Sequence, residues 1–176
     1  TRLLTAKVLR EILPLVRDAH QDFTSREASL ACHRIAKRLG ENGREANKLL
    51  LDDEDEEDAT VFQFALDAAV REAGKMTAVE VSNTLWAFAT LANKGVRVDE
   101  KTVRAVSEQV PRVAHRYEPH GVSNVWWAHA SLAATTGFEV RQATLRGVTK
   151  QALKVAARMR APEVSNTLWA LAKLAT

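Results

Sequence analysis

The sequence predicts an all-α protein, an α-solenoid in which about four antiparallel helix pairs stack one on the next. The first observation is a motif that occurs three times, as VSNTLWAFATL from Val81, VSNVWWAHASL from Val122 and VSNTLWALAKL from Val164. The intervals are 41 and 42 residues, a period that indicates helical repeats rather than a single globule. The second is composition, because alanine is abundant whereas glycine supplies only 7 and proline 4 of the 176 residues. We therefore expect one domain over residues 1–176, stacked as a right-handed superhelix.

A weaker copy of the motif lies upstream, where FTSREASLACHRIAKRLG from Phe23 aligns with MTAVEVSNTLWAFATLAN from Met76. This alignment places His33 under Trp86. Each copy starts with a helix-start signal, which is either a capping box or a proline in the first turn, where its missing N–H is not needed. The signals are Thr24-x-x-Glu27, Thr77-x-x-Glu80, Pro119 and Pro162.

Each helix that carries the motif, here called a motif helix, is expected to follow a helix of different character, here called its partner helix. Pro14 and Pro111 fall inside partner helices and should kink or break them, because proline lacks the N–H that the helix interior uses. We expect the partner helices at Leu3–His20, Ala59–Ala73, Asp99–Tyr117 and Val140–Met159. With their motif helices they would form pairs over 3–39, 59–93, 99–135 and 140–175.

Residues 40–58 interrupt the period, and we expect them to form an acidic insertion loop with a short helix over Arg44–Leu51. The run Asp52–Asp58 (DDEDEED) holds seven of the 22 acidic residues. The other 169 residues carry 25 basic and 15 acidic side chains, so their net charge is +10, whereas that of the whole chain is +3. The run is either a solvated loop or an electrostatic mimic that folds against the basic surface and competes with nucleic acid.

The partner helices repeat basic residues at one register. In the last of them, Val148 and Val155 share an apolar face, and four basic residues lie opposite at four-residue spacing. Stacked repeats would align these residues with basic residues of the earlier partner helices. The result is either a solvated outer face or a surface that contacts phosphates. The aligned columns are Arg71/Arg112/Lys154 and Lys75/Arg116/Arg158, with Arg104, Arg146 and Lys150 beside them.

The motif helices are apolar on nearly all sides, which is typical of a helix packed on more than one side. Alanines at one register (Ala87, Ala128 and Ala170) would permit close approach between neighbouring repeats. The tryptophans at another register are either wedges between repeats or platforms on which nucleobases stack. These tryptophans are Trp86, Trp127 and Trp169.

An asparagine also recurs on the polar side of each complete motif. It either forms a hydrogen-bonded ladder between repeats or reads the edge of one base per repeat. Positions that vary between repeats are better candidates for sequence specificity. The asparagines are Asn83, Asn124 and Asn166, and the variable columns are Arg26/Val79/His120/Pro162 and Thr90/Ser131/Lys173.

Several classes of protein are not expected. The single cysteine, Cys32, cannot form an internal disulfide, and the sequence shows neither a signal peptide nor an apolar run of about 18 residues that could span a membrane. The five histidines lack the spacing of a metal site, and no phosphate-binding glycine loop or catalytic constellation is apparent. We expect no enzyme activity, cofactor or small-molecule substrate. Because the chain starts without methionine and stops within a helical pattern, we expect a processed protein or a piece of a larger one.

At residues 81–91, 122–132 and 164–174 the sequence resembles the octotricopeptide repeat family and the related helical repeats that precede RAP domains in organellar proteins. Residues 28–38 match only at small and apolar positions, and the period is longer than is usual in the family. The resemblance implies an α-solenoid that binds single-stranded RNA in chloroplasts or mitochondria, where it acts in transcript processing, stability or translation. No RAP domain is present in these residues, so nothing indicates a nuclease.

The sequence therefore favours a non-catalytic RNA-binding module, with basic side chains on phosphates and polar side chains of the motif helices facing the bases. The alternative is a protein-binding scaffold or structural subunit of an organellar ribosome or membrane complex, because solenoid surfaces serve that purpose equally well. The candidate RNA-binding residues are Arg71, Lys75, Arg104, Arg112, Arg116, Arg146, Lys150, Lys154, Arg158, Asn83, Asn124 and Asn166.

Overall fold

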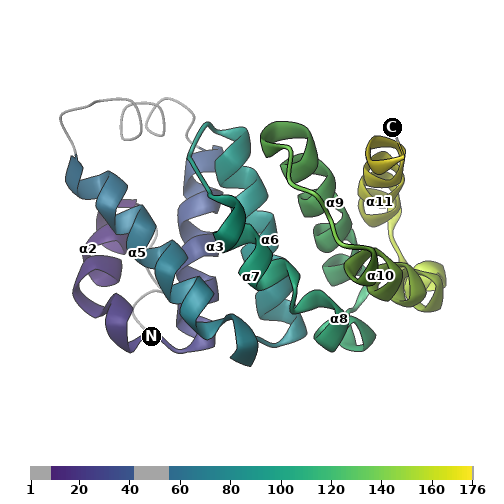
Figure 1. Ribbon diagram of the computed structural model, residues 1–176, viewed down its shortest axis with the longest axis horizontal. Coiled ribbons are helices and arrows are strands. Elements are labelled where there is room, and N and C mark those ends of the chain that lie inside the picture. Colours follow the sequence, from purple (N-terminus) through teal and green to yellow (C-terminus); the bar gives the residue numbers. More distant parts are fainter. Residues whose placement is uncertain (1–8, 42–55, 176) are drawn as a thin grey trace.

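The computed structural model describes residues Leu9 to Glu41 and Glu56 to Ala175, and every regular element in these two stretches is helical (Figure 1). The prediction of an all-α protein is confirmed. The motif helices are α3 (Ser25–Glu41), α6 (Ala78–Asn93), α9 (Pro119–Thr136) and α11 (Ala161–Leu174). The partner helices are α2 (Leu9–Ala19), α5 (Glu56–Glu72), α7 (Glu100–Ser107) with α8 (Val110–Val113), and α10 (Gln142–Val155).

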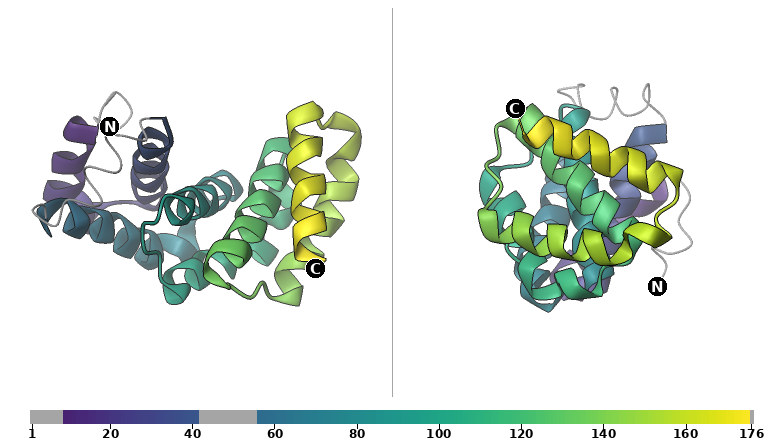
Figure 2. Two further views of the ribbon diagram at one scale, coloured as in Figure 1. Left: turned by 90° about the horizontal axis from the view of Figure 1, so that it is seen from above. Right: turned by 90° about the vertical axis from the view of Figure 1, so that its right-hand side faces the viewer.

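The helices form two layers. The motif helices lie side by side in chain order, since α3 packs on α6, α6 on α9 and α9 on α11. The partner helices cover one side of this row, with α2 against α5, α5 against α7, and α8 against α10. In Figure 2 (left) the row of motif helices bends along its length. The two inner motif helices, α6 and α9, therefore have a motif helix before and after them as well as neighbours in the partner layer.

The two inner motif helices, α6 and α9, are buried on most sides because helices pack on both sides of them. Leu85 and Phe88 of α6 are buried. Their counterparts in α9, Trp126 and His129, are buried as well. Ala87, Ala128 and Ala170 are also inaccessible to solvent, as the close-approach interpretation requires. A side chain larger than a methyl group at this register would push neighbouring motif helices apart.

Every partner helix ends in the same way. A 3₁₀ turn follows the helix, and the next residue is extended and begins the motif segment. The side chains of these extended residues (Phe23, Met76 and Tyr117) are buried, and that of Met159 is half-buried. The four turns are His20–Asp22, Ala73–Lys75, Ala114–Arg116 and Ala156–Arg158.

The two prolines behave differently. Pro111 divides the partner helix expected over 99–117 into α7 and α8, so the predicted break is confirmed there. At Pro14 the helix does not break, because α2 continues through this residue. Pro14 lies on the exposed side of α2.

The insertion is shorter than expected. Residues 42–55, which include the predicted helix over Arg44–Leu51 and the first four acids of the run, lie outside the described residues. The assignment of Glu56–Asp58 to a loop is wrong, because these residues form the first turn of α5, and α3 continues to Glu41. Acidic residues in a first turn are favourable because they face the positive end of the helix dipole.

Candidate nucleic-acid interface

One face of the motif helices carries four positions spaced three or four residues apart, and these positions recur from helix to helix. We call this the motif face. Because the helices lie side by side, each position forms a column across α3, α6, α9 and α11. The columns are Arg26/Val79/His120/Pro162, Leu30/Asn83/Asn124/Asn166, His33/Trp86/Trp127/Trp169 and Lys37/Thr90/Ser131/Lys173.

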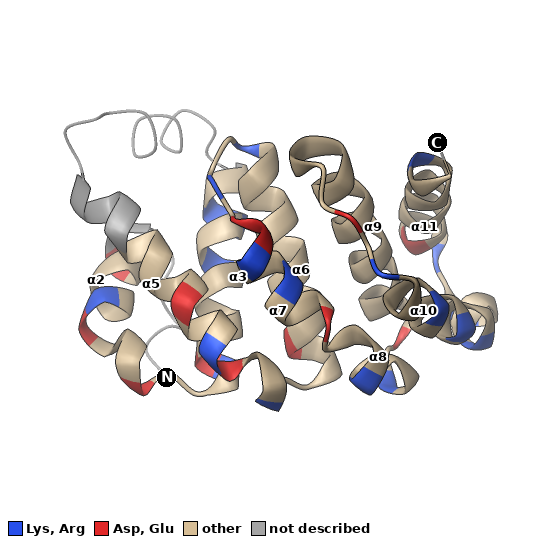
Figure 3. Cartoon of the chain, in the orientation of Figure 1, with Lys and Arg blue, Asp and Glu red and all other residues tan. Residues whose placement is uncertain are grey.

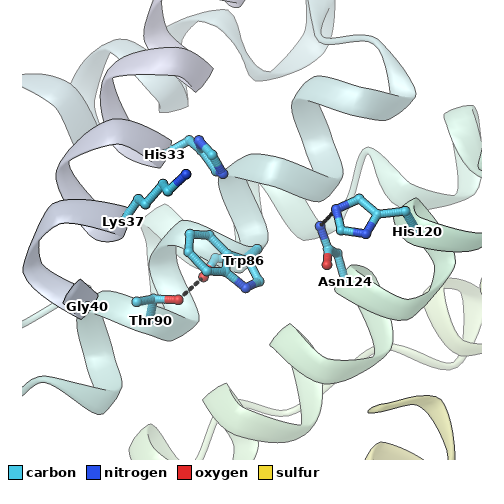
Figure 4. Close-up of a pocket in the computed structure, with 7 residues that line it drawn as sticks. All are labelled: His33, Lys37, Gly40, Trp86, Thr90, His120 and Asn124. Carbon is cyan, nitrogen blue, oxygen red and sulfur yellow. Dashed lines mark hydrogen bonds between the residues drawn. The ribbon is translucent and has the colours of Figure 1, made fainter. Parts of the chain in front are cut away.

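The motif face is hollowed in two places. One hollow of about 400 Å³ spans α3, α6 and α9 (Figure 4). A second hollow of about 200 Å³ lies between the first halves of α3 and α6, and His33 borders both. The larger hollow is lined by His33, Lys37, Gly40, Trp86, Thr90, His120 and Asn124.

Three aromatic rings follow one another across the motif helices, and the first two of them line the larger hollow. The ring centroids of His33 and Trp86 are 5.1 Å apart, and those of Trp86 and Trp127 are 6.4 Å apart. All three side chains are half-buried, so each contacts a ring on a neighbouring helix and still presents part of its surface to solvent. This placement is compatible with both interpretations of the tryptophans, packing between repeats and stacking on a base.

The asparagines differ from one another. Asn124 is buried, and its Nδ2 lies 3.2 Å from Nε2 of His120 on the preceding turn (Figure 4). Asn83 is half-buried and Asn166 is exposed. No hydrogen bond joins these asparagines to one another in the described residues, so they do not form the ladder that was one of the two interpretations.

The variable columns fall partly on the hollow. His120 and Thr90 line it, and Val79 lines the smaller hollow. Ser131 is buried, so it is not available as a specificity residue. Lys173, the counterpart of Ser131 in α11, is exposed.

Two of the predicted phosphate-binding arginines instead hold the fold together. Arg71 donates to the carbonyl oxygens of His20 and Phe23, at 2.9 and 3.3 Å. Arg112, at the same register one repeat later, donates to the carbonyl oxygen of Met76 at 2.8 Å. Each arginine thus joins its partner helix, through a hydrogen bond, to the turn that ends the preceding partner helix.

Three of the other seven predicted basic residues pair with acids. Lys75 contacts Glu72 at 3.0 Å, Arg158 contacts Glu118 at 2.6 Å, and Arg104 pairs with Glu100. Arg116 is exposed, and its Nε lies 3.2 Å from the imidazole of His115. The pair of Arg158 and Glu118 is exposed, and such a pair contributes little to stability. In all three pairs the basic charge is partly offset for an incoming polyanion.

The remaining three basic residues form an exposed row on α10 (Figure 3). Arg146, Lys150 and Lys154 have neither an ion pair nor a hydrogen bond from their side chains among the described residues. This row lies opposite the buried Val148 and Val155, as the sequence predicts. It is in the partner layer, so the structure does not bring these basic residues and the three asparagines into one site.

Two side chains of the hollow, those of His33 and Lys37, were predicted neither as RNA contacts nor as specificity positions. His33 and Lys37 belong to the weak first copy, where the tryptophan signature is absent. The alignment of His33 with Trp86 was the signal that could have found them. Burial, together with the positive charges of Lys37 and Arg34, lowers the pKa of His33 below its ordinary value, so its ring is neutral at pH 7.

Comparison with known proteins gives no further guidance, because neither a family model, nor a curated protein, nor a solved structure matches this chain. Within the described residues there is no group of three His, Cys, Asp or Glu side chains that could hold a metal ion. In the same residues, no helix is both long and apolar enough to cross a membrane. The motif face offers flat aromatic surface, amide and imidazole hydrogen-bonding groups, and lysines at its edge.

Proposed function

We propose that the chain is an α-solenoid segment of the octotricopeptide repeat type, and that it binds single-stranded RNA on its motif face without catalysing a reaction. The observation that carries this proposal is the larger hollow, where the half-buried rings of His33 and Trp86 lie beside polar groups from neighbouring helices. The resemblance of the motif adds the proposal that the module works in a chloroplast or mitochondrion, on transcript processing, stability or translation.

The chemistry of the hollow fits an unpaired base and its phosphate. A base could stack on the exposed part of Trp86, and such stacking contributes about 1–3 kcal/mol per base. Asn124 and His120 lie across the hollow and offer groups for the edge of that base. Lys37 is exposed at the border of the hollow, where its ammonium group can approach a phosphate.

The electrostatics of the two hollows favour an anion. Among their lining residues the basic side chains are Arg26 and Lys37, and the one acid is Glu80. The Glu80 carboxylate accepts a hydrogen bond from the backbone N–H of Thr77 at 2.8 Å and closes the capping box of α6. We infer that phosphates follow the motif face rather than the basic residues of the partner layer.

Trp86→Leu tests the stacking step. We expect about a tenfold loss of affinity for a single-stranded RNA oligonucleotide of mixed sequence, measured by fluorescence anisotropy, because one stacked base is lost. The matched control is Trp126→Leu. Trp126 is buried away from the hollow, and leucine stands at its register in α6 and α11, as Leu85 and Leu168. Equal affinity of Trp86→Leu and the parent would contradict the proposal.

A pair of charge reversals tests which layer holds the phosphates. Lys37→Glu with Lys173→Glu alters the motif face, and Lys150→Glu with Lys154→Glu alters the exposed row on α10. We expect the first pair to flatten the dependence of binding on salt concentration by about one to two units of log–log slope, and the second pair to leave it unchanged. Arg112 and Arg158 are unsuitable for this test because each makes a contact between repeats.

The alternative, a protein-binding scaffold, is favoured by one observation, the exposed apolar face of α11. A protein-binding scaffold would not bind RNA even at low salt, and Trp86 would make no contact with RNA. Failure of the parent protein to bind the oligonucleotide at low salt would therefore favour this alternative.

A further inference from the structure

The last motif helix exposes side chains that the earlier motif helices bury. Val164, Leu168 and Leu171 are 39%, 61% and 43% exposed. Ser165 and Ala172, on the same side of α11, are exposed as well. The counterparts of these five residues are buried in both α6 and α9. They are Val81, Ser82, Leu85, Phe88 and Ala89 in α6, and Val122, Ser123, Trp126, His129 and Ala130 in α9.

The difference arises from packing, since the two sides of α11 differ. Ala170 and Thr167 are buried where α11 meets α9. In α6 and α9 the side with the corresponding apolar residues is covered by the repeat that follows, and no described helix follows α11. The exposed face of α11 therefore continues an interface that is already formed between α6 and α9 and between α9 and α11.

Not every exposed apolar residue in this region belongs to an interface between repeats. Leu153 of α10 is 77% exposed, but its counterpart one repeat earlier, Pro111, is exposed too. Its exposure is thus a property of the outer surface of the partner layer. Leu153 serves as an internal control for the face of α11.

The opposite end of the row is chemically different. Arg34 of α3 stands at the register of Ala87, Ala128 and Ala170, and Arg38 stands at the register of Leu91, Leu132 and Leu174. Charged residues at these positions suit the end of a stack of helical repeats, where a polar outer surface is needed. They do not suit close packing on the apolar face of α11, which disfavours head-to-tail association of two copies of this chain.

We propose that the exposed face of α11 is a docking surface for one more helix pair of the same repeat, which would pack on α11 as α11 packs on α9. The docking helix would carry alanine at the register of Ala170, because only a small side chain fits between adjacent motif helices. The proposal concerns this interface alone and does not depend on RNA binding.

The experiment supplies that helix pair. A second copy of residues 135–176 is appended directly after Thr176, which continues the register because Ala134 is the counterpart of Thr176. Leu168→Cys in the original α11 then reports on the face through its rate of labelling by a neutral maleimide at pH 7. Cys32 does not interfere, because its thiol is buried and donates a hydrogen bond to the carbonyl oxygen of Ala65. We expect labelling to be roughly tenfold slower, or more, in the extended chain than in the 176-residue chain.

Two controls define the interface. Leu153→Cys should be labelled at the same rate in both chains. Ala170→Arg in the appended copy, which imitates Arg34, should restore fast labelling of the cysteine at position 168. A second extended chain, which carries a copy of residues 94–134 instead, guards against an appended copy that does not fold.

Two results would overturn the proposal. The first is fast labelling of the cysteine at position 168 in both extended chains. The second is protection that is already present in the 176-residue chain, rises with protein concentration and accompanies a dimer in sedimentation, because the occupant would then be a second copy. Neither result bears on RNA affinity, so this proposal and the proposed function fail independently.

Discussion

His129 is a buried histidine whose two ring nitrogens both have partners. Nε2 lies 2.8 Å from the Ser107 hydroxyl, and Nδ1 lies 2.8 Å from the carbonyl oxygen of Val125. Because a carbonyl can only accept, Nδ1 carries the proton and Nε2 accepts from the hydroxyl. Burial lowers the pKa of His129 to about 4, so the ring is neutral at pH 7.

This pKa predicts how stability depends on pH. The unfolded chain takes up the proton near pH 6.5, whereas the folded chain does so only near pH 4. Stability is therefore full above about pH 6.5 and falls on acidification, by up to about 1.4 kcal/mol per pH unit, until about pH 4. Urea unfolding at pH 7, 5.5 and 4.5 measures this slope.

His129→Leu, which introduces the residue found at this register in α11, should remove most of the slope. His33, whose pKa is also lowered, would supply the part that remains. The exposed His115 provides the control, since His115→Gln should leave the slope as it is. An unchanged slope in His129→Leu would mean that other groups cause the acid sensitivity.

At the scale of elements, the contacts between partner helices and the preceding turns explain why consecutive repeats keep one geometry. Arg71 and Arg112 reach carbonyl oxygens of the turn before them. In the last repeat the corresponding bond comes from Gln151, one turn before the position that aligns with Arg112. Gln151 donates to the carbonyl oxygen of Tyr117 at 2.7 Å. These bonds fix each partner helix against the start of the preceding motif helix.

Arg112→Ala should therefore reduce the free energy of unfolding by about 1–2 kcal/mol, because the carbonyl of Met76 loses a charged donor. The matched variant Arg116→Ala, at an exposed position on the following turn, should change it by less than about 0.5 kcal/mol. Chemical denaturation at pH 7 gives both values. Equal effects of the two substitutions would show that the contact to Met76 contributes nothing.

The sequence predicts the elements well where the motif is complete. The spacing of Val81, Val122 and Val164 locates three motif helices, and Pro111 marks the division of a partner helix. The start of α5 could not be predicted, because the acids Glu56–Asp58 suit either a solvated loop or a first helical turn. Composition does not separate these two structures.

The candidate site is predicted less well, and the reason is the direction of side chains. Periodicity places Arg71 and Arg112 on a polar face but does not show that backbone carbonyls lie within their reach. It also aligns Asn124 with Asn166, although one is buried and the other exposed. Burial of that kind depends on which neighbours each helix has, and a repeat motif does not encode it.

At the scale of the whole molecule, residues at the same register of different motif helices contribute differently to the free energy of unfolding. Leu85 is fully buried, whereas Leu168, its counterpart in α11, is 61% exposed. Leu85→Ala should cost about 2–5 kcal/mol, since it leaves a cavity between packed helices. Leu168→Ala should cost less than about 1 kcal/mol.

Thermal or urea unfolding of the two variants at low protein concentration measures this difference. The pair is matched in residue type, helix position and substitution, so only the neighbours differ. If Leu168→Ala were as costly as Leu85→Ala, the face of α11 would already be covered in the isolated chain.

The 3₁₀ turn that closes each partner helix has a kinetic consequence. It reverses the chain within a few residues, and each helix packs on helices that are near it in the chain: α5 on α3, α7 on α6 and α10 on α9, with the motif helices in chain order. Contacts between segments close in the chain need little loop closure before they form, and such topologies fold fast. We expect folding to start at any helix pair and to spread outward, and unfolding to begin at the ends, where each pair has a single neighbour.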